Sequence, residues 1–312
     1  MRTVPAPSAA FAARERSGVA YAVSAYGLWG LFPLYFLLLL PSGPFEIVAY
    51  RVLFSFVFCL IVITMLRRWD KIFAMVRQTR LFLTLGVAGI LIFGNWQVYV
   101  LAVLGGHVTE AALGYFINPI VTVLLGVLLL REKLRPAQWT AVALSGVAVL
   151  VLAINYGAFP WIALALAFTF GLYGYAKKSV GGEVDALTGL TIETAWLVPV
   201  ALAELVFVGM TTGITFGNIS VANTLLLLSA GVVTAIPLLL FAASARRLRL
   251  TTIGLIQYLT PILQFVIGAF VLNEAMPTSR WIGFALVWMA LIILSVDMVV
   301  SGRSRRALPL PG

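Results

Sequence analysis

Two ionisable residues lie deep inside long apolar stretches and are the first candidates for chemistry. Arg51 lies about six residues into the stretch 45–66, and Glu193 lies about six residues into the stretch 187–208. An ionisable group at such a depth is costly in lipid, so it usually faces a cavity or another charge. We therefore expect this pair to serve a substrate or a coupling ion. A structural ion pair or a locally hydrated group is the alternative.

The two charges suit different tasks. An arginine stays charged and can hold an anionic group of a substrate. Glu193 is the better candidate for proton coupling, because movement relative to Arg51 would change its protonation. At 1.5 Å of rise per residue and a hydrocarbon core of about 30 Å, the two residues would be about 12 Å apart along the membrane normal. Whether they touch directly, or through a substrate or water, is left open.

Aromatic rings and a few polar side chains form a second set of candidates. The deep aromatic residues are Tyr26, Trp29, Trp96, Tyr99, Tyr115, Tyr173, Trp196 and Tyr258, and the deep polar residues are Asn95, Asn118 and Gln257. Rings with polar tips suit an amphipathic organic solute and can hold a cation. For each ring, helix packing is the alternative to lining a site.

Pro119 and Pro261 lie inside apolar stretches, beside the polar residues Asn118 and Thr260. A proline within a helix frees a backbone carbonyl and predicts a kink. In a membrane such a kink is tolerated where neighbours or a water-lined cavity satisfy the freed group. We expect both stretches to border a central cleft, and contact with a ligand is left open.

Membrane helices must position these residues. The chain is 62% hydrophobic and 10% charged with a mean hydropathy of +1.06, whereas a soluble domain carries about 25% charged residues. Most apolar stretches have the roughly 20 residues that cross a bilayer as a helix. The sequence predicts an all-α integral membrane protein with ten spans at 18–40, 45–66, 81–104, 110–130, 136–154, 158–176, 187–208, 221–245, 252–272 and 281–301.

The second half of the chain repeats the first. Residues 109–154 realign without gaps on residues 251–296 at an offset of 142, which also relates Arg51 to Glu193. Because each half holds an odd number of spans, the halves should be inverted, as in many secondary transporters. The predicted parts are an N-terminal cytoplasmic tail at 1–17, a first five-helix repeat at 18–155, a second at 156–301, and a C-terminal cytoplasmic tail at 302–312.

The positive charge is confined to one side of the predicted membrane. The net charge is +10, and 19 of the 21 Lys and Arg residues fall in the tails and in loops of one face. Arg280 lies on the other face and Arg51 lies within a span. The positive-inside rule therefore predicts that both termini are cytoplasmic. Nucleic-acid binding is not expected, since it would require basic residues gathered on a water-exposed surface.

The residues that bind metals or cofactors are scarce. Cys59 is the only cysteine and His107 the only histidine. No phosphate-binding loop, catalytic serine motif or metal-binding motif is present, so neither a cofactor nor a metal is expected. His107 could sense protons or make a cap or loop contact near Thr109 and Glu110. The expected partners are a small-molecule substrate and the lipid bilayer, and a homodimer is compatible with the sequence.

Several short motifs are distinctive. They are Tyr26 to Gly30, Asn95-Trp96, Gly106-His107, Glu110-Ala111, Leu113 to Pro119 (LGYFINP), Ile192-Glu193-Thr194, Ala245 to Gly254 (ARRLRLTTIG) and Gln257-Tyr258. Together they resemble the RarD family of EamA-type carriers, in the drug/metabolite transporter superfamily. The resemblance covers nearly the whole chain and implies ten helices in two inverted halves and transport of small molecules across the inner membrane. In that family a histidine often precedes the span-two arginine. Tyr50 stands there in this chain, so any proton role of that histidine does not carry over.

These features predict a secondary carrier with alternating access. Export of a metabolite or drug-like molecule is the leading hypothesis, and uptake or exchange of an organic anion is the second. A membrane-embedded enzyme that acts on lipid headgroups is a third, but it would need catalytic groups that converge at one interface.

Overall fold

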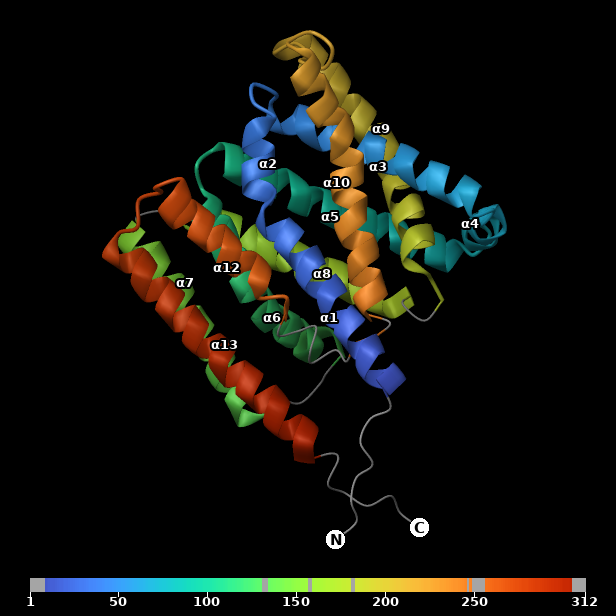
Figure 1. The fold of residues 1–312 in the computed structure, drawn as a ribbon. Coiled ribbons are helices and arrows are strands. Elements are labelled where there is room, and N and C mark those ends of the chain that lie inside the picture. Colours follow the sequence, from blue (N-terminus) through green and yellow to red (C-terminus); the bar gives the residue numbers. More distant parts are fainter. Residues whose placement is uncertain are drawn as a thin grey trace, which may run out of the picture.

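The computed structural model describes residues 9–130, 134–156, 159–180, 183–245, 247–248 and 256–304. Within these ranges the chain forms helices, turns and loops and no strands (Figure 1). The helices are α1 (Ala9–Gly30), α2 (Phe32–Leu38), α3 (Pro44–Met65), α4 (Trp69–Val76), α5 (Thr79–Leu104), α6 (Val108–Leu130), α7 (Pro136–Tyr156), α8 (Trp161–Val180), α9 (Ala186–Thr211), α10 (Val221–Ala245), α12 (Leu259–Val266), the π-helix η1 (Ile267–Val271) and α13 (Thr278–Ser304).

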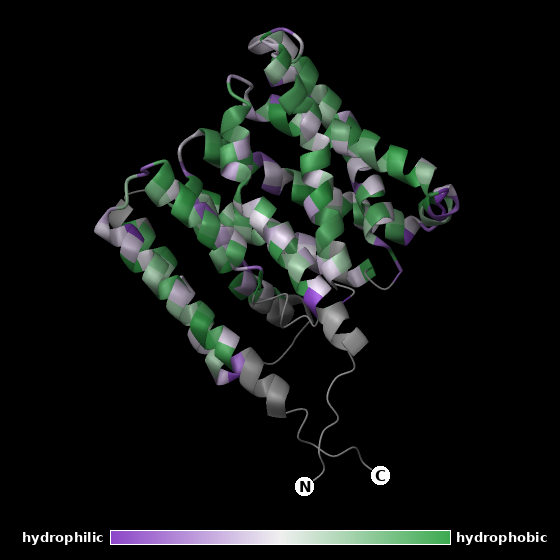
Figure 2. Cartoon of the chain, viewed as in Figure 1, coloured by the Kyte–Doolittle hydropathy of each residue, from purple (hydrophilic) through white to green (hydrophobic). Residues whose placement is uncertain are grey.

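Five of the described helices are long and apolar enough to cross a membrane, namely α3, α5, α9, α10 and α13. The bent pair of α1 and α2 makes a sixth if it counts as one span. Large apolar side chains remain exposed on their outer faces, including Ile61, Ile90, Val206 and Ile292. Hydrophobic colours accordingly dominate the helices and hydrophilic colours the loops (Figure 2). The fold is that of an all-helical, multi-pass membrane protein.

The helix ends follow from local sequence. α3 and α7 begin at Pro44 and Pro136, where the missing N–H of proline would have had no partner within the helix. Asp185 precedes α9 and accepts a hydrogen bond from the backbone N–H of Thr188 at 3.1 Å, which is the usual role of an N-cap side chain. After α9 the chain turns at Gly213, whose φ of 82° favours glycine.

Two predicted spans are irregular, and one loop is helical. The first span bends by 43° between α1 and α2, next to Pro33. The described part of the ninth divides into α12 and η1. The loop between the second and third spans contains the short helix α4, which places Trp69 and Phe73 on an exposed face.

Helices from the two halves pack against one another throughout the fold. α3 packs on α9 and α10, α5 on α8 and α9, and α7 on α13, with which it lies side by side at one edge (Figure 1). At the contact between α3 and α10, a Cβ atom added to Gly231 would overlap the backbone carbonyl carbon of Phe54. Only glycine lets these two backbones approach so closely, and this contact lies one turn from Arg51.

Candidate functional site

Arg51 is held in the interior by one hydrogen bond and three aromatic rings. Its side chain is 3% exposed, and its Nε donates to the hydroxyl of Thr234 on α10 at 2.8 Å. The guanidinium carbon lies 4.2 Å from the ring centroid of Trp96 on α5, and 5.3 and 5.6 Å from those of Phe32 and Phe36 on α2. We call Trp96, Phe32 and Phe36 the aromatic cage. A cation over such faces is stabilised by the ring quadrupoles.

The cage leaves part of the guanidinium without a partner. Among the described residues, Nη1 of Arg51 has no hydrogen-bond acceptor, and the three ion pairs found there involve other side chains. Arg51 is therefore a buried cation whose charge is met by rings and one hydroxyl group instead of a carboxylate.

Glu193 has a different environment from its repeat mate. Its side chain is 2% exposed, and Oε1 lies 2.6 Å from the ammonium nitrogen of Lys177 on α8. Oε2 accepts a hydrogen bond from the hydroxyl of Tyr173 at 3.3 Å. In this conformation Glu193 is thus paired with Lys177, and Arg51 takes no part in this ion pair. Lys177 was predicted to lie in a loop, but α8 continues past the apolar stretch to Val180 and so carries this lysine.

Asn95 connects three helices next to the cage. Its side chain is 1% exposed, and its Nδ2 donates to the carbonyl of Leu166 at 3.1 Å and to the hydroxyl of Thr169 at 3.0 Å. The Tyr115 hydroxyl donates to its Oδ1 at 3.0 Å. The Tyr115 ring packs on Tyr99, with 5.7 Å between centroids. These two tyrosines, Asn95 and the cage form one continuous aromatic and polar region.

The other candidates are distributed more widely. The Asn118 side chain donates to the carbonyl of Ala167 at 3.1 Å and so ties α6 to α8. Trp29 packs on Tyr26 at 5.3 Å, and Trp196 packs on Phe82 at 5.0 Å in a separate apolar cluster. Gln257 and Tyr258 lie partly buried in the turn before α12.

The two prolines have different local effects. Pro119 lies within α6, which continues through it. Pro261 lies in the first turn of α12, directly after a break at Gln257 and Tyr258. Without a proline N–H, the Gln257 carbonyl cannot form the usual helical bond, and it accepts instead from the N–H of Thr260 at 3.3 Å.

Two carboxylates bind backbone N–H groups at the end of the bundle where the α2–α3 loop lies. Glu46, 1% exposed, accepts from the N–H groups of Thr215 and Phe216 at 2.8 and 3.1 Å. Glu274 accepts from the N–H of Val108 and from the N–H and hydroxyl of Thr109, the last two at 2.8 and 2.6 Å. Glu46 lies in the first turn of α3, but its hydrogen bonds go to the loop after α9.

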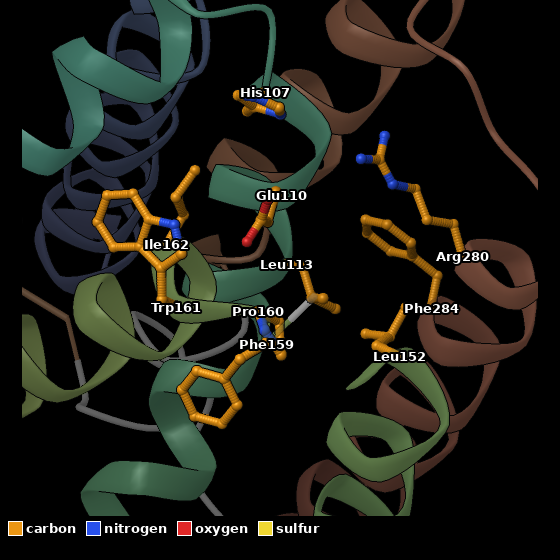
Figure 3. Close-up of a pocket in the computed structure, with 10 residues that line it drawn as sticks. All are labelled: His107, Glu110, Leu113, Leu152, Phe159, Pro160, Trp161, Ile162, Arg280 and Phe284. Atoms are coloured by element: carbon orange, nitrogen blue, oxygen red, sulfur yellow. The ribbon is translucent and has the colours of Figure 1, made fainter. Parts of the chain in front are cut away.

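A pocket of about 210 Å³ opens between α6, α8 and α13 (Figure 3). Its lining is mainly apolar, and its ionisable members are His107, Glu110 and Arg280. Glu110 points into the pocket and faces the backbone N–H groups of Ile162 and Ala163 in the first turn of α8. His107 is exposed. Neither Arg51 nor Glu193 lines this pocket, so it is separate from the caged arginine.

Comparison with known proteins identifies the family. The model of the EamA-like transporter family matches residues 16–154. Protein RarD of Streptomyces exfoliatus is 46% identical over 293 residues, which cover 94% of this chain and 92% of that protein. The chain belongs to the RarD family of EamA-like transporters. Protein RarD of Escherichia coli is 39% identical and covers 94% of this chain, which spans 98% of that relative.

Further matches agree with this family. Uncharacterized transporter YojE of Bacillus subtilis is 42% identical, and the aligned region covers 95% of this chain and 99% of that protein. A crystal structure of a protein 18% identical aligns with a TM-score of 0.57 over 90% of this chain and 97% of that one, which bears on the fold alone. RarD family membership makes the chain a membrane transporter.

Only part of the caged site could be predicted from the sequence. Arg51 was singled out for its depth and Trp96 was among the deep aromatics, but Phe32 and Phe36 carried no signal that separates them from other apolar residues. Thr234 and Lys177 were missed as partners. Thr234 lies in the middle of an apolar stretch and Lys177 just beyond the end of one, and polar groups at such positions are candidates for partners of a buried charge.

Proposed function

We propose that this RarD family member is a secondary transporter that moves a small organic solute across the inner membrane by alternating access. It would have ten spans, arranged as two inverted halves of five. The first half runs from α1 to α7, including the connecting helix α4, and the second from α8 to α13. Because the sequence holds no nucleotide-binding motif, the driving force would be an ion gradient, exchange or the membrane potential.

The packing pattern carries this proposal. The proposed repeat pairs α1 with α8, α3 with α9, α5 with α10, α6 with α12 and α7 with α13. When each helix is replaced by its mate, the contact of α5 with α8 corresponds to that of α10 with α1, and the contact of α6 with α8 corresponds to that of α12 with α1. The packing of α5 on α9 becomes that of α10 on α3. The pairs α3 with α9 and α7 with α13 are exchanged with themselves. Such a pattern supports two related halves that rock against each other around a common site.

The repeat-related charges support a site between the halves. Arg51 is bonded to Thr234 of the second half, while Glu193 faces Lys177 and Tyr173. We assign Arg51 to the solute and Glu193 to coupling. Export of a metabolite or drug-like molecule remains the leading direction, with exchange or uptake of an organic anion as the alternative.

Reconstitution tests the transport function. Purified protein in liposomes should move solute unaltered and saturably, and should accumulate it when a gradient is imposed. A product that is chemically changed would favour the membrane-enzyme alternative, and leakage equal to that of empty vesicles would contradict transport.

The orientation has its own test. From the distribution of Lys and Arg we propose that both termini are cytoplasmic. A cysteine introduced at exposed Thr212 in a Cys59→Ser background should then react only with reagents added outside the cell. Reaction only from the cytoplasmic side would contradict the topology.

A further inference from the structure

The caged arginine lacks a negative partner. Arg51 stays protonated at neutral pH, and no carboxylate among the described residues lies within ion-pair distance of it. Glu193 is paired with Lys177, and Glu46 is bonded to the loop at Thr215 and Phe216. The charge of Arg51 is thus uncompensated within the part of the chain that the structure describes.

The aromatic cage offsets only part of the cost of burying this charge. Removing an ion from water is costly even in a relaxed protein, and the attraction of ring faces repays only part of that cost. Rings supply no hydrogen-bond acceptor in their plane, and Nη1 of Arg51 remains without one. An anion that approaches Nη1 would provide both the missing charge and the missing acceptor.

A second buried donor without a partner belongs to the same region. The hydroxyl of Tyr99 has no hydrogen-bond partner among the described residues, and the side chain is 3% exposed. Its ring packs on Phe36 of the cage with 6.0 Å between centroids, and it is close enough to Arg51 for the two groups to interact electrostatically. A buried donor left unpaired is costly, so this hydroxyl is available to the same anion.

Resting on the transport function proposed above, we propose that Arg51 and Tyr99 bind the carboxylate of a monocarboxylate substrate with a largely apolar body. The guanidinium Nη1 and the Tyr99 hydroxyl donate to the carboxylate oxygens. The apolar body lies against the aromatic rings, where a second charge on the substrate would find no counterion. This chemistry excludes simple amines, which would be repelled by Arg51, and it favours the organic-anion alternative for the solute.

The position of α2 explains how the site can open. Phe32 and Phe36, which cover Arg51, both belong to this short helix, which is bent by 43° from α1. The Tyr35 hydroxyl fastens α2 to α10 by donating to the carbonyl of Leu226 at 2.9 Å, and it lies 3.1 Å from the hydroxyl of Ser229. Substrate reaches Arg51 when α2 and α10 separate, and the same rings close over it afterwards.

Binding to the purified full-length protein tests this inference. The probes are acetate, butanoate, phenylacetate and indole-3-acetate, each beside its neutral amide, with phenethylamine as the cationic probe. Calorimetry should detect binding of at least one carboxylate. The affinity should increase along the series as the apolar body grows, and each carboxylate that binds should do so at least tenfold more tightly than its amide. Binding of no carboxylate, or equal binding of a carboxylate and its amide, would overturn the proposal.

Variants assign the binding to the cage. Arg51→Gln should abolish carboxylate binding, and Tyr99→Phe should weaken it about tenfold because one hydrogen bond to a charged group is lost. Arg80→Gln, an equal change of charge at an exposed position, should bind as the unaltered protein does. Circular dichroism and gel filtration identify unfolded variants. If Arg51→Gln fails to fold, Tyr99→Phe decides, and unchanged affinity in a folded variant overturns the site.

Counterflow into liposomes separates this site from the transport function itself. If carboxylates bind through Arg51 but no vesicle exchanges them, the site stands and the transport proposal fails. If vesicles carry a neutral solute equally well with Arg51→Gln, transport stands and the carboxylate site is wrong. Carboxylate exchange that is lost with Arg51→Gln supports both.

Discussion

The ammonium nitrogen of Lys177 lies 2.6 Å from Oε1 of Glu193. Glu193 is 2% exposed while the Lys177 side chain is 30% exposed, so the lysine joins a buried carboxylate to the edge of the protein. A buried ion pair contributes little net stability, yet removal of one partner leaves an uncompensated charge. Because the pair adds little stability but leaves a costly charge when it is broken, Glu193 is suited to take up a proton when Lys177 moves away.

Glu193→Gln should abolish accumulation driven by a proton gradient while exchange of solute continues. Glutamine keeps the shape of the side chain and can still face Lys177 and Tyr173, but it cannot bind and release a proton. Uptake into liposomes with an imposed proton gradient, compared with counterflow without one, measures the two activities. Tyr173→Phe removes only a hydroxyl at 3.3 Å and should keep both, and normal accumulation by Glu193→Gln would return the pair to a structural role.

Replacing Pro261 should change the fold more than replacing Pro119. Alanine at 261 restores an N–H that can bond to the carbonyl of Gln257, so α12 should extend back through Gln257 and Tyr258. α6 is already continuous through Pro119, and there alanine should only straighten the helix. Transport should fall in both variants while membrane insertion stays normal, with the larger loss at 261. Normal transport rates in both variants at normal expression would remove the prolines from the mechanism.

Much of the helix pattern could be predicted because it follows from apolar length and local end signals. α10 has the predicted limits, and α3 begins and ends within one residue of the predicted 45–66. Neither the bend between α1 and α2 nor the helix α4 was predicted, although Pro33 marks the position of the bend. The helix α4 is only 8 residues long, which is too short for its amphipathic pattern to stand out within a basic loop.

The site was harder to predict because side-chain partners depend on the packing of distant helices. Depth in an apolar stretch identified Arg51 and Glu193, but depth along a helix does not say which face is turned inward. The partners of Arg51 and Glu193 come from α2, α5, α8 and α10. Only tertiary packing fixes such a combination. The repeat related the two charges but left open whether they touch, and in this conformation Glu193 is paired with Lys177.

Asp185 should make the start of α9 sensitive to acid. Partial burial raises the pKa of this carboxyl. Hydrogen bonds from Thr188 and the charge of Lys71 together lower the pKa by more than burial raises it, so it is below the ordinary 3.8. Stability from such a group is complete above the unfolded pKa and is lost as pH falls through the folded pKa. Asp185→Ala should cost about 1 kcal/mol at neutral pH and less below pH 3.8.

Asp185→Asn separates the cap from the ion pair with Lys71, which lies at 3.5 Å. Asparagine can still accept from the N–H of Thr188, so most of the stability should remain. Thermal unfolding in detergent across this pH range measures both variants. A loss with alanine that is independent of pH, or a loss with asparagine as large as with alanine, would contradict the assignment.

The contact of Glu274 with Val108 and Thr109 should hold one end of the two halves together. The carboxylate accepts from both N–H groups and from the Thr109 hydroxyl, which also accepts from Nη1 of Arg280 at 3.1 Å. The close approach requires glycine at position 268, because an added Cβ atom there would lie only 2.8 Å from Cγ2 of Thr109. Glu274→Gln loses the charge and one acceptor oxygen, so it should weaken this closure by about 1–3 kcal/mol.

Spin labels at exposed His107 and Thr278 in a Cys59→Ser background report the separation of the two halves at this end. With Glu274→Gln the distance distribution should gain a longer component and the melting temperature should fall, because the state open at this end is then less disfavoured. Thr109→Val is the matched control, since it removes the hydroxyl but leaves both backbone N–H groups to the carboxylate, and its shift should be smaller. An unchanged distribution in Glu274→Gln, together with an unchanged melting temperature, would mean that this contact does not control the opening.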